Sequence, residues 1–261
     1  MKNGTLITRR QTMLLLAASG APSRRARAAS GLFQGVEITH VSLTVTDLKR
    51  CGEFYRDTLG LPVLRPGLLG VGDDYLALAA NTTAGMDHFG VSIENYSRDA
   101  VAEKLRGAKV DSRTDGEAVY VNDPDGIQVR LCETGHFAAG LQPKEPVPGS
   151  LFSAVEFNHM ALSVSDVGRS REFYQMLLGL PVTSQGARNT FLGMGKNFLA
   201  LFQSSPSGLN HYCYSIRNYE VGRVVQVLEQ KGLRPRREAN RVYFPDPDGL
   251  TVQLAEVGHG A

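Results

Sequence analysis

The histidines are the residues of this sequence best suited to chemistry, and all six occur as matched pairs. His40 matches His159, His88 matches His211, and His136 matches His259. Imidazole binds divalent transition metals through a ring nitrogen, and it exchanges protons near neutral pH. Three histidines in each half of a chain could form two equivalent metal or acid–base sites, so the elements that position them decide the chemistry.

The segments around the histidines repeat as well, which shows that the chain is a tandem duplication. The separation between the copies is 119 residues at His40 and His159 and 123 at Tyr120 and Tyr243. The matched segments are 36–40 with 155–159, 53–55 with 172–174, 59–63 with 178–182, and 119–126 with 242–249. The copies therefore span residues 36–136 and 155–259. A proline-containing linker, 137–154, joins them.

Each copy contains the same order of predicted elements. Apolar and polar residues alternate over 38–45 as they do in a strand. Asp47 then caps the start of a helix that ends near Leu59, before Gly60. Short strands follow and end near residues 75–79. A second strand at 88–93 precedes a helix at 97–106, and strands flank the Asp-Pro-Asp-Gly turn at 123–126. The sequence thus predicts an α+β chain of four βαβββ units.

These motifs resemble those of the vicinal oxygen chelate superfamily. The resemblance rests on the H-x-x-L-x-V-x-D opening, the F-Y-x-x-x-L-G-L-P run and the D-P-D-G turn, each present twice. The superfamily contains glyoxalases, extradiol dioxygenases, fosfomycin-resistance proteins and metal-free bleomycin-binding proteins. It implies two tandem cup-shaped domains, and in the enzymes each active cup holds one divalent metal ion.

The resemblance also assigns ligand positions. The family's first-strand ligand falls on His40 and His159, and its fifth-strand histidine falls on His88 and His211. The glutamate that glyoxalases carry on the fourth strand is replaced by Ala77 and Ala200. The glutamate four residues past the turn glycine is replaced by Arg130 in the first copy and Gln253 in the second.

These replacements predict a metal site in the second copy, made by His159, His211 and Gln253, for one divalent ion such as Fe, Mn, Zn or Ni. Glu256 is a less favoured third ligand, because strand alternation points it to the other face. Tyr243 occupies the position of an active-site tyrosine in extradiol dioxygenases and is a candidate catalytic residue. Those enzymes also have acid–base histidines, whereas this chain has Lys196 and Asn197 just before His211.

The first copy carries a permanent cation where a metal ligand is expected, and Arg130 would repel a metal. We therefore expect a metal-free pocket lined by His40, His88, Arg130 and Tyr120, which would suit an anion. His136 and His259 are expected to lie on surface tails. The three cysteines, Cys51, Cys132 and Cys213, are odd in number and widely spaced, and they indicate no disulfide framework. Cys132 and Cys213 share strand faces with Arg130 and His211, and packing is expected for them rather than a role in lining the cups.

Residues 1–29 have the pattern of an export signal rather than of a folded segment. Arg9 and Arg10 precede a short apolar run at 13–18 and an Ala-Arg-Ala sequence at 26–28, an order that resembles a twin-arginine signal. We therefore expect a periplasmic or extracellular protein. The composition shows no basic stripe for nucleic acid and no apolar run that could span a membrane.

Two functions remain open at this point. The first is an exported metal-dependent enzyme, dioxygenase-like or lyase/isomerase-like, whose substrate is a small molecule with chelating oxygen atoms. The second is a metal-free protein of the bleomycin-resistance type that sequesters a small ligand. The sequence leaves the formation of a homodimer open.

Overall fold

The computed structural model describes residues 31–135 and 145–260. The predicted signal at 1–29, His136 and residues 137–144 of the linker lie outside this range. The first copy contains β1 (Gly35–Val45), α1 (Leu48–Leu59), β2 (Val63–Arg65), β3 (Leu68–Val71), β4 (Asp74–Ala80), β5 (Gly85–Ile93), α2 (Arg98–Gly107), β6 (Ser112–Asp115), β7 (Ala118–Asn122) and β8 (Gln128–Glu133). The second copy contains β9 (Ala154–Val164), α3 (Val167–Leu178), β10 (Val182–Gln185), β11 (Asn189–Met194), β12 (Asn197–Gln203), β13 (Gly208–Ile216), α4 (Val221–Gln230), β14 (Arg236–Glu238), β15 (Arg241–Pro245) and β16 (Thr251–Glu256).

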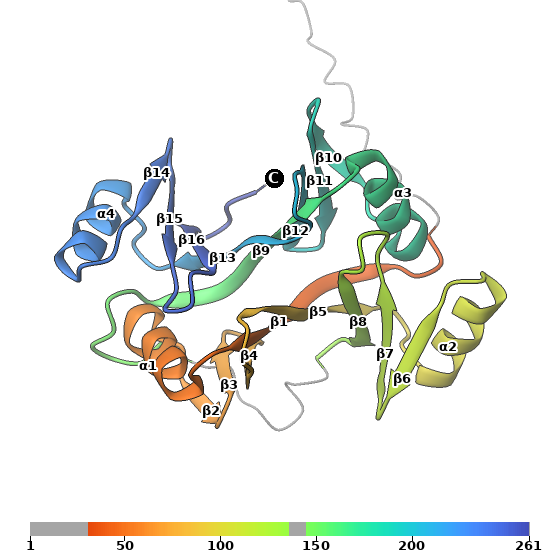
Figure 1. Ribbon diagram of the computed structural model, residues 1–261, viewed down its shortest axis with the longest axis horizontal. Coiled ribbons are helices and arrows are strands. Elements are labelled where there is room, and N and C mark those ends of the chain that lie inside the picture. Colours follow the sequence, from red (N-terminus) through yellow and green to blue (C-terminus); the bar gives the residue numbers. More distant parts are fainter. Residues whose placement is uncertain (1–30, 136–144, 261) are drawn as a thin grey trace, which may run out of the picture.

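Each copy folds into one eight-stranded mixed sheet (Figure 1). The strand order is β2-β3-β4-β1-β5-β8-β7-β6 in the first copy, and β10-β11-β12-β9-β13-β16-β15-β14 in the second. In the first sheet β1 pairs in parallel with β4 and antiparallel with β5, so the two βαβββ units meet at the β1–β5 pair. The predicted tandem α+β fold is confirmed.

The sequence determines the ends of α1 and α3 in the same way. Asp47 accepts a hydrogen bond from the Arg50 amide at 2.9 Å, and Asp166 accepts one from the Arg169 amide at 3.0 Å. These carboxylates satisfy amides that lack a partner within the helix. Each helix ends at a glycine with positive φ, Gly60 at 76° and Gly179 at 67°, a conformation that costs other residues more.

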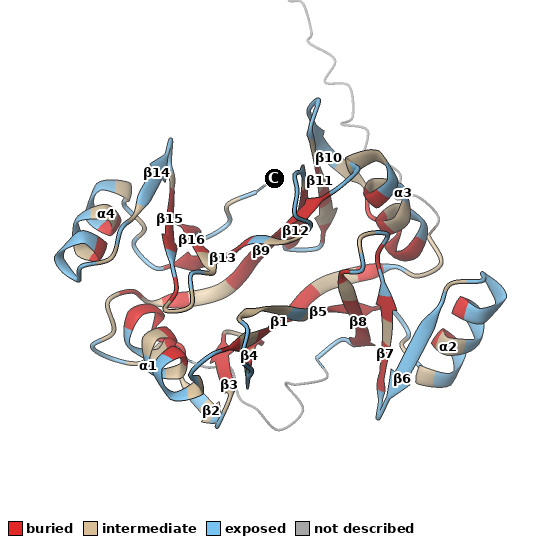
Figure 2. Ribbon diagram, in the orientation of Figure 1, coloured by how far each residue is buried: buried red, intermediate tan, exposed pale blue. Residues whose placement is uncertain are grey.

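The first helix of each copy packs against the other copy. The Tyr55 hydroxyl, on α1, donates to Asp246 Oδ2 at 2.6 Å and also contacts the Tyr212 hydroxyl on β13. On α3, the Tyr174 hydroxyl donates to Asp123 Oδ2 at 3.0 Å. One apolar core contains residues of both copies, and buried residues lie along the central strands of both sheets (Figure 2). The copies are therefore interlocked, and neither buries its helix alone.

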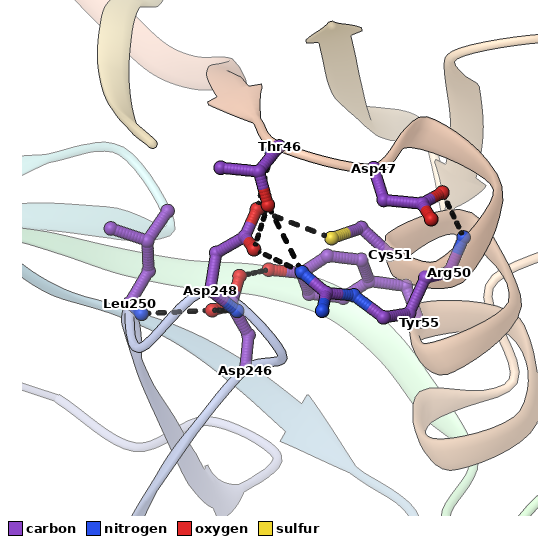
Figure 3. Close-up of polar contacts among 8 residues, drawn as sticks. All are labelled: Thr46, Asp47, Arg50, Cys51, Tyr55, Asp246, Asp248 and Leu250. Atoms are coloured by element: carbon purple, nitrogen blue, oxygen red, sulfur yellow. Dashed lines mark hydrogen bonds and ion pairs between the residues drawn. The ribbon is translucent and has the colours of Figure 1, made fainter. Parts of the chain in front are cut away.

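The second aspartate of each Asp-Pro-Asp-Gly turn adds a further carboxylate to this contact, in an arrangement that we call the clasp. In one clasp, Asp248 accepts hydrogen bonds from the Thr46 amide at 2.7 Å and the Thr46 hydroxyl at 2.6 Å, and it pairs with Arg50 (Figure 3). In the other clasp, Asp125 accepts from the Ser165 amide at 3.1 Å, and Arg169 lies 2.9 Å away. The carboxylates of the two turns thus help to hold the two copies together.

None of the helices in the described part of the chain combines the length and the apolar character that a membrane span requires.

Candidate functional site

Two histidines from adjacent central strands face each other in each copy. His159 lies on β9 and His211 on β13, and their Nε2 atoms are 3.2 Å apart. In the first copy, the Nε2 atoms of His40 on β1 and His88 on β5 are 3.1 Å apart. We call the space around the first pair and Arg130 the first cup, and the space around the second pair and Gln253 the second cup.

In the second cup both histidines hold their protons on the outer nitrogen. His159 Nδ1 lies 2.8 Å from Asn158 Oδ1, and His211 Nδ1 lies 2.8 Å from Asn210 Oδ1. The Asn158 orientation follows from its Nδ2, which donates to the His259 carbonyl, a group that only accepts. An amide oxygen also only accepts, so both Nδ1 atoms must donate. Both neutral rings then present an unprotonated Nε2 to each other.

At neutral pH no additional proton lies between the two Nε2 atoms, because both histidine rings are neutral. Burial lowers the pKa of His159 well below its usual value, and the charge of His211 lowers it further. Burial, with Arg236 and Arg241 nearby, lowers the pKa of His211 to about 4. Two lone pairs therefore face each other. Two imidazole nitrogens that each bind one zinc ion at about 2.1 Å lie a little over 3 Å apart, so the separation fits a metal ion.

The first cup satisfies its histidines without a cation. Asp87 Oδ2 lies 2.6 Å from His88 Nδ1, so this nitrogen donates and His88 Nε2 accepts. On the other ring, the Thr39 hydroxyl lies 2.9 Å from His40 Nδ1. A hydroxyl can donate, which leaves the His40 proton on Nε2 and directed at His88. The three contacts Thr39–His40, His40–His88 and His88–Asp87 are then all hydrogen bonds, each with one proton between its two atoms.

The residue beside the histidines also differs. Gln253 is 1% exposed, and among the described residues neither Oε1 nor Nε2 has a hydrogen-bond partner of normal geometry. A buried amide without well-formed hydrogen bonds is costly. Gln253 lies beside both histidines and acts on the pKa of each, against the larger effect of burial. Its carbonyl oxygen completes a set of three neutral donors, His159, His211 and Gln253.

Aromatic rings and arginines surround both cups in the same pattern. Tyr243, the predicted catalytic residue, packs edge-on against His211 with ring centroids 5.2 Å apart, and the Arg236 guanidinium covers its ring at 4.3 Å. In the first cup, Tyr120 packs edge-on against His88 at 5.4 Å, and Arg113 covers it at 4.2 Å. The structure thus brings both predicted tyrosines to the cups.

Other candidates lie elsewhere. Glu256 is exposed at the end of β16, and Ala200 is buried on β12 with no polar atom in its side chain. Lys196 lies 3.3 Å from Asp74 Oδ2, and Asn197 Oδ1 accepts from the Ile38 amide at 3.0 Å. Both residues therefore bind the first copy, and they are not the acid–base groups of a ring-cleaving site. In the described range, no group of three or more His, Cys, Asp or Glu side chains is placed to hold a metal.

The position of His259 differs from the expectation of a surface tail. Its ring centroid lies 6.1 Å from that of His159, and its carbonyl accepts from Asn158 Nδ2 at 3.0 Å. The residue follows β16, where the strand periodicity has ended, so only its pairing with His136 marked it in the sequence. His136 itself lies outside the described residues.

All three cysteines are buried and free, in agreement with the packing role predicted for Cys132 and Cys213. Burial raises the pKa of the Cys51 thiol to about 11, and Asp248 adds to the effect. Burial also raises the pKa of Cys132 and Cys213. A protonated buried thiol is a poor nucleophile and a poor metal ligand.

Comparisons with known proteins agree with this architecture. Residues 156–254 match the profile of the Glyoxalase/Bleomycin resistance protein/Dioxygenase superfamily. A probable chloroplastic lactoylglutathione lyase of Arabidopsis thaliana is 26% identical over 169 residues, which cover 54% of this chain and 43% of that protein. This chain therefore spans less than half of the length of that relative.

Two solved structures have the same fold over most of the chain. The 2,3-dioxygenase LapB from Pseudomonas sp. KL28 gives a TM-score of 0.68 at 17% identity, covering 87% of this chain and 94% of that one. The Mn(II)-bound glyoxalase from Novosphingobium aromaticivorans gives 0.69 at 19% identity, covering 87% and 84%. Each likeness establishes the arrangement of strands and helices.

Proposed function

Because the chain belongs to the Glyoxalase/Bleomycin resistance protein/Dioxygenase superfamily, we propose that its second cup is the centre of a divalent-metal-dependent enzyme. The substrate would be a small molecule with two adjacent oxygen atoms, and the reaction an oxygenation or a lyase/isomerase step. A structural relative with this fold is a Mn(II)-bound glyoxalase. The ligands would be His159, His211 and Gln253.

One observation carries this proposal: the Nε2 atoms of His159 and His211 face each other 3.2 Å apart, while each Nδ1 lies against an asparagine oxygen. The asparagines behind the rings fix both protons on Nδ1, and burial keeps the rings neutral. Hydrogen bonds of this kind, made by the outer nitrogen of a histidine, orient it as a metal ligand. Gln253, whose buried amide lies beside both histidines without a hydrogen bond of normal geometry among the described residues, supports the same site.

The neutral ligand set indicates the kind of substrate. A bound divalent ion would supply Lewis acidity to two substrate oxygens. Because the three donors carry no charge, the substrate would provide the compensating negative charge, and Arg236 and Arg241 add positive charge beside the histidines. Burial raises the pKa of Tyr243, so its hydroxyl stays protonated and can donate a hydrogen bond to a substrate oxygen. An anionic chelating substrate fits these groups best.

The test is metal content. Protein purified without chelators and reloaded with Fe, Mn, Zn or Ni should hold one ion per chain by mass spectrometry of the elements. His159→Ala and His211→Ala should each lose it. His88→Ala is the matched control, because it removes the equivalent histidine of the first cup and should leave the content unchanged.

Wild-type protein that holds no ion after loading would overturn the proposal and favour a metal-free binder of the bleomycin-resistance type. Retention of the ion by both second-cup variants would overturn it as well, because the ion would then lie at another site.

Export remains part of the proposal. The sequence from Thr8 to Ala29 supports it through the paired Arg9 and Arg10 and the Ala-Arg-Ala segment. A fusion of residues 1–29 to a reporter should appear in the periplasmic fraction of a bacterium that has twin-arginine export. The Arg9→Lys, Arg10→Lys double variant should remain in the cytoplasm. Equal distribution of the two fusions would contradict this route.

A further inference from the structure

The first cup is a cavity in its own right. It encloses about 340 Å³ and is lined by His40, Arg65, Pro66, Gly67, Leu68, Tyr75, Ala77, His88 and Arg130. Arg65 and Pro66 are exposed at its rim, whereas His40 and Tyr75 are 1% and 3% exposed. A volume of this size holds a ligand of several heavy atoms, and the partly apolar wall is typical of a small-molecule site.

The charge of this cavity has one sign. Two arginines, Arg65 and Arg130, line it, and no carboxylate is among its lining residues. Both arginines act on the Tyr75 hydroxyl: burial raises its pKa, and the two positive charges oppose that rise. Asp87, which neighbours His88, already accepts from His88 Nδ1. An anion that enters the cavity would therefore meet positive charge along the wall.

The histidines are not the groups that bind such an anion. His40 donates to His88, and His88 donates to Asp87, so the imidazole protons are used within the pair. The other donors at the cavity wall are the two guanidinium groups and the Tyr75 hydroxyl, which lies 3.5 Å from Arg130 Nη1. Guanidinium binds a carboxylate through two parallel N–H groups, which makes it a specific partner for that group.

We propose that the first cup is a metal-free binding site for a small organic carboxylate. Arg130 and Arg65 would bind the carboxylate, and Leu68, Ala77 and the Tyr75 ring would contact its carbon skeleton. The site is independent of the metal centre proposed for the second cup, because it uses residues of the first copy. The cavity is larger than inorganic phosphate requires, and its apolar lining favours a carbon skeleton.

Titration calorimetry at low salt tests the proposal with benzoate, succinate, benzamide and inorganic phosphate as probes. Benzoate or succinate should bind, and benzamide, which lacks the charge, should bind at least about 10-fold more weakly. Arg130→Gln introduces the residue of the second copy and should weaken carboxylate binding by about 10- to 100-fold. Arg65→Gln, at the exposed rim, should act in the same direction with a smaller effect.

The control variants separate this site from the rest of the molecule. Arg106→Gln removes an equal charge from an exposed position on α2 and should leave binding unchanged. His211→Ala, which alters only the second cup, should also leave it unchanged, so failure of the metal proposal would not affect the result. Equal affinity for benzoate and benzamide, binding of phosphate alone, or equal binding by Arg130→Gln would each overturn the proposal.

Discussion

The two cups share a histidine pair with almost the same separation, and they differ in the residues behind it. Thr39 and Asp87 stand behind the first pair, and Asn158 and Asn210 stand behind the second. A hydroxyl can donate a hydrogen bond to a ring nitrogen, whereas an amide oxygen can only accept a hydrogen bond. The first pair therefore closes on itself through a hydrogen bond, and the second pair is left with two opposed lone pairs.

The third position separates the cups further. Arg130 brings a permanent positive charge to the first cup, and Gln253 brings a neutral, buried amide to the second. Both differences act in the same direction, away from a cation in the first cup and toward one in the second. The same fold thus carries a cationic third residue in one cup and a neutral one in the other.

Exchange of Gln253, the third residue of the second cup, should have the largest effect on the difference in metal affinity between the cups. Gln253→Arg gives the second cup the charge of the first, and we expect metal affinity to fall by more than about 100-fold, beyond the cost of losing a supporting hydrogen bond. Gln253→Glu restores the carboxylate of the superfamily and should tighten binding. Competition with a fluorescent chelator measures both values. Equal affinity for the two variants would show that Gln253 is not a ligand.

The residue behind the first-strand histidine gives the next largest effect. Asn158→Thr copies Thr39 into the second cup and allows a proton on His159 Nε2, so metal affinity should fall by about 10- to 100-fold. The same chelator competition measures it. Thr39→Asn, the reverse change, should leave the metal content of the whole chain unchanged, because Arg130 still repels a cation. A metal-binding defect in Thr39→Asn would contradict the assignment of the site to the second copy.

The two clasps should contribute equally to the free energy of unfolding, in contrast to the two cups. Asp125→Ala and Asp248→Ala each remove a carboxylate that joins the copies, and each should cost about 1–2 kcal/mol of unfolding free energy. Burial opposes ionisation of both carboxyls, but hydrogen bonds from Ser165 and Thr46 lower their pKa. Their contribution is therefore present above the unfolded pKa of about 4 and is lost as the pH falls through the lower folded value.

Urea denaturation at pH 7 and pH 3 measures this contribution. Each variant should differ from the wild type more at pH 7 than at pH 3. A cost confined to one of the two variants would show that the duplicated turns have diverged in structure as well as in chemistry.

The sequence predicted the parts of the fold that depend on local pattern. The Asp47 cap, the Gly60 stop and the strands that carry His159 and His211 are set by neighbouring residues, and they lie where the repeat placed them. Gln253 was placed by its distance of four residues from the turn glycine, Gly249, and strand alternation, which is a local property, separated it from Glu256. These features need no knowledge of distant contacts.

Contacts between the copies could not be predicted in this way. Asp248 bonds Thr46, about 200 positions away, and the turn motif that carries it indicates only a reversal of the chain. Lys196 and Asn197 resemble replacements in an active site, but they are held at the contact between copies. His259 lies near His159 because the chain beyond β16 folds back, and no periodicity records that path.

Asp74 and Asn197, which begin the equivalent strands β4 and β12, offer the smallest and most specific test. Asn197 accepts a hydrogen bond from Ile38 of the first copy and donates one to the Phe157 carbonyl of its own copy, whereas Asp74 is buried beside Lys196. Burial raises the pKa of Asp74 to about 7, against the opposing charge of Lys196. The folded state thus holds a proton that the unfolded state has released between about pH 4 and pH 7, so this carboxyl reduces stability as the pH rises through that range.

Asp74→Asn should therefore stabilise the protein by about 1 kcal/mol at pH 8.5 and change little at pH 4, as urea denaturation would measure. Asn197→Asp should create the same pH dependence in the second copy, and parallel pH profiles for wild type and Asp74→Asn would contradict this account of the contact.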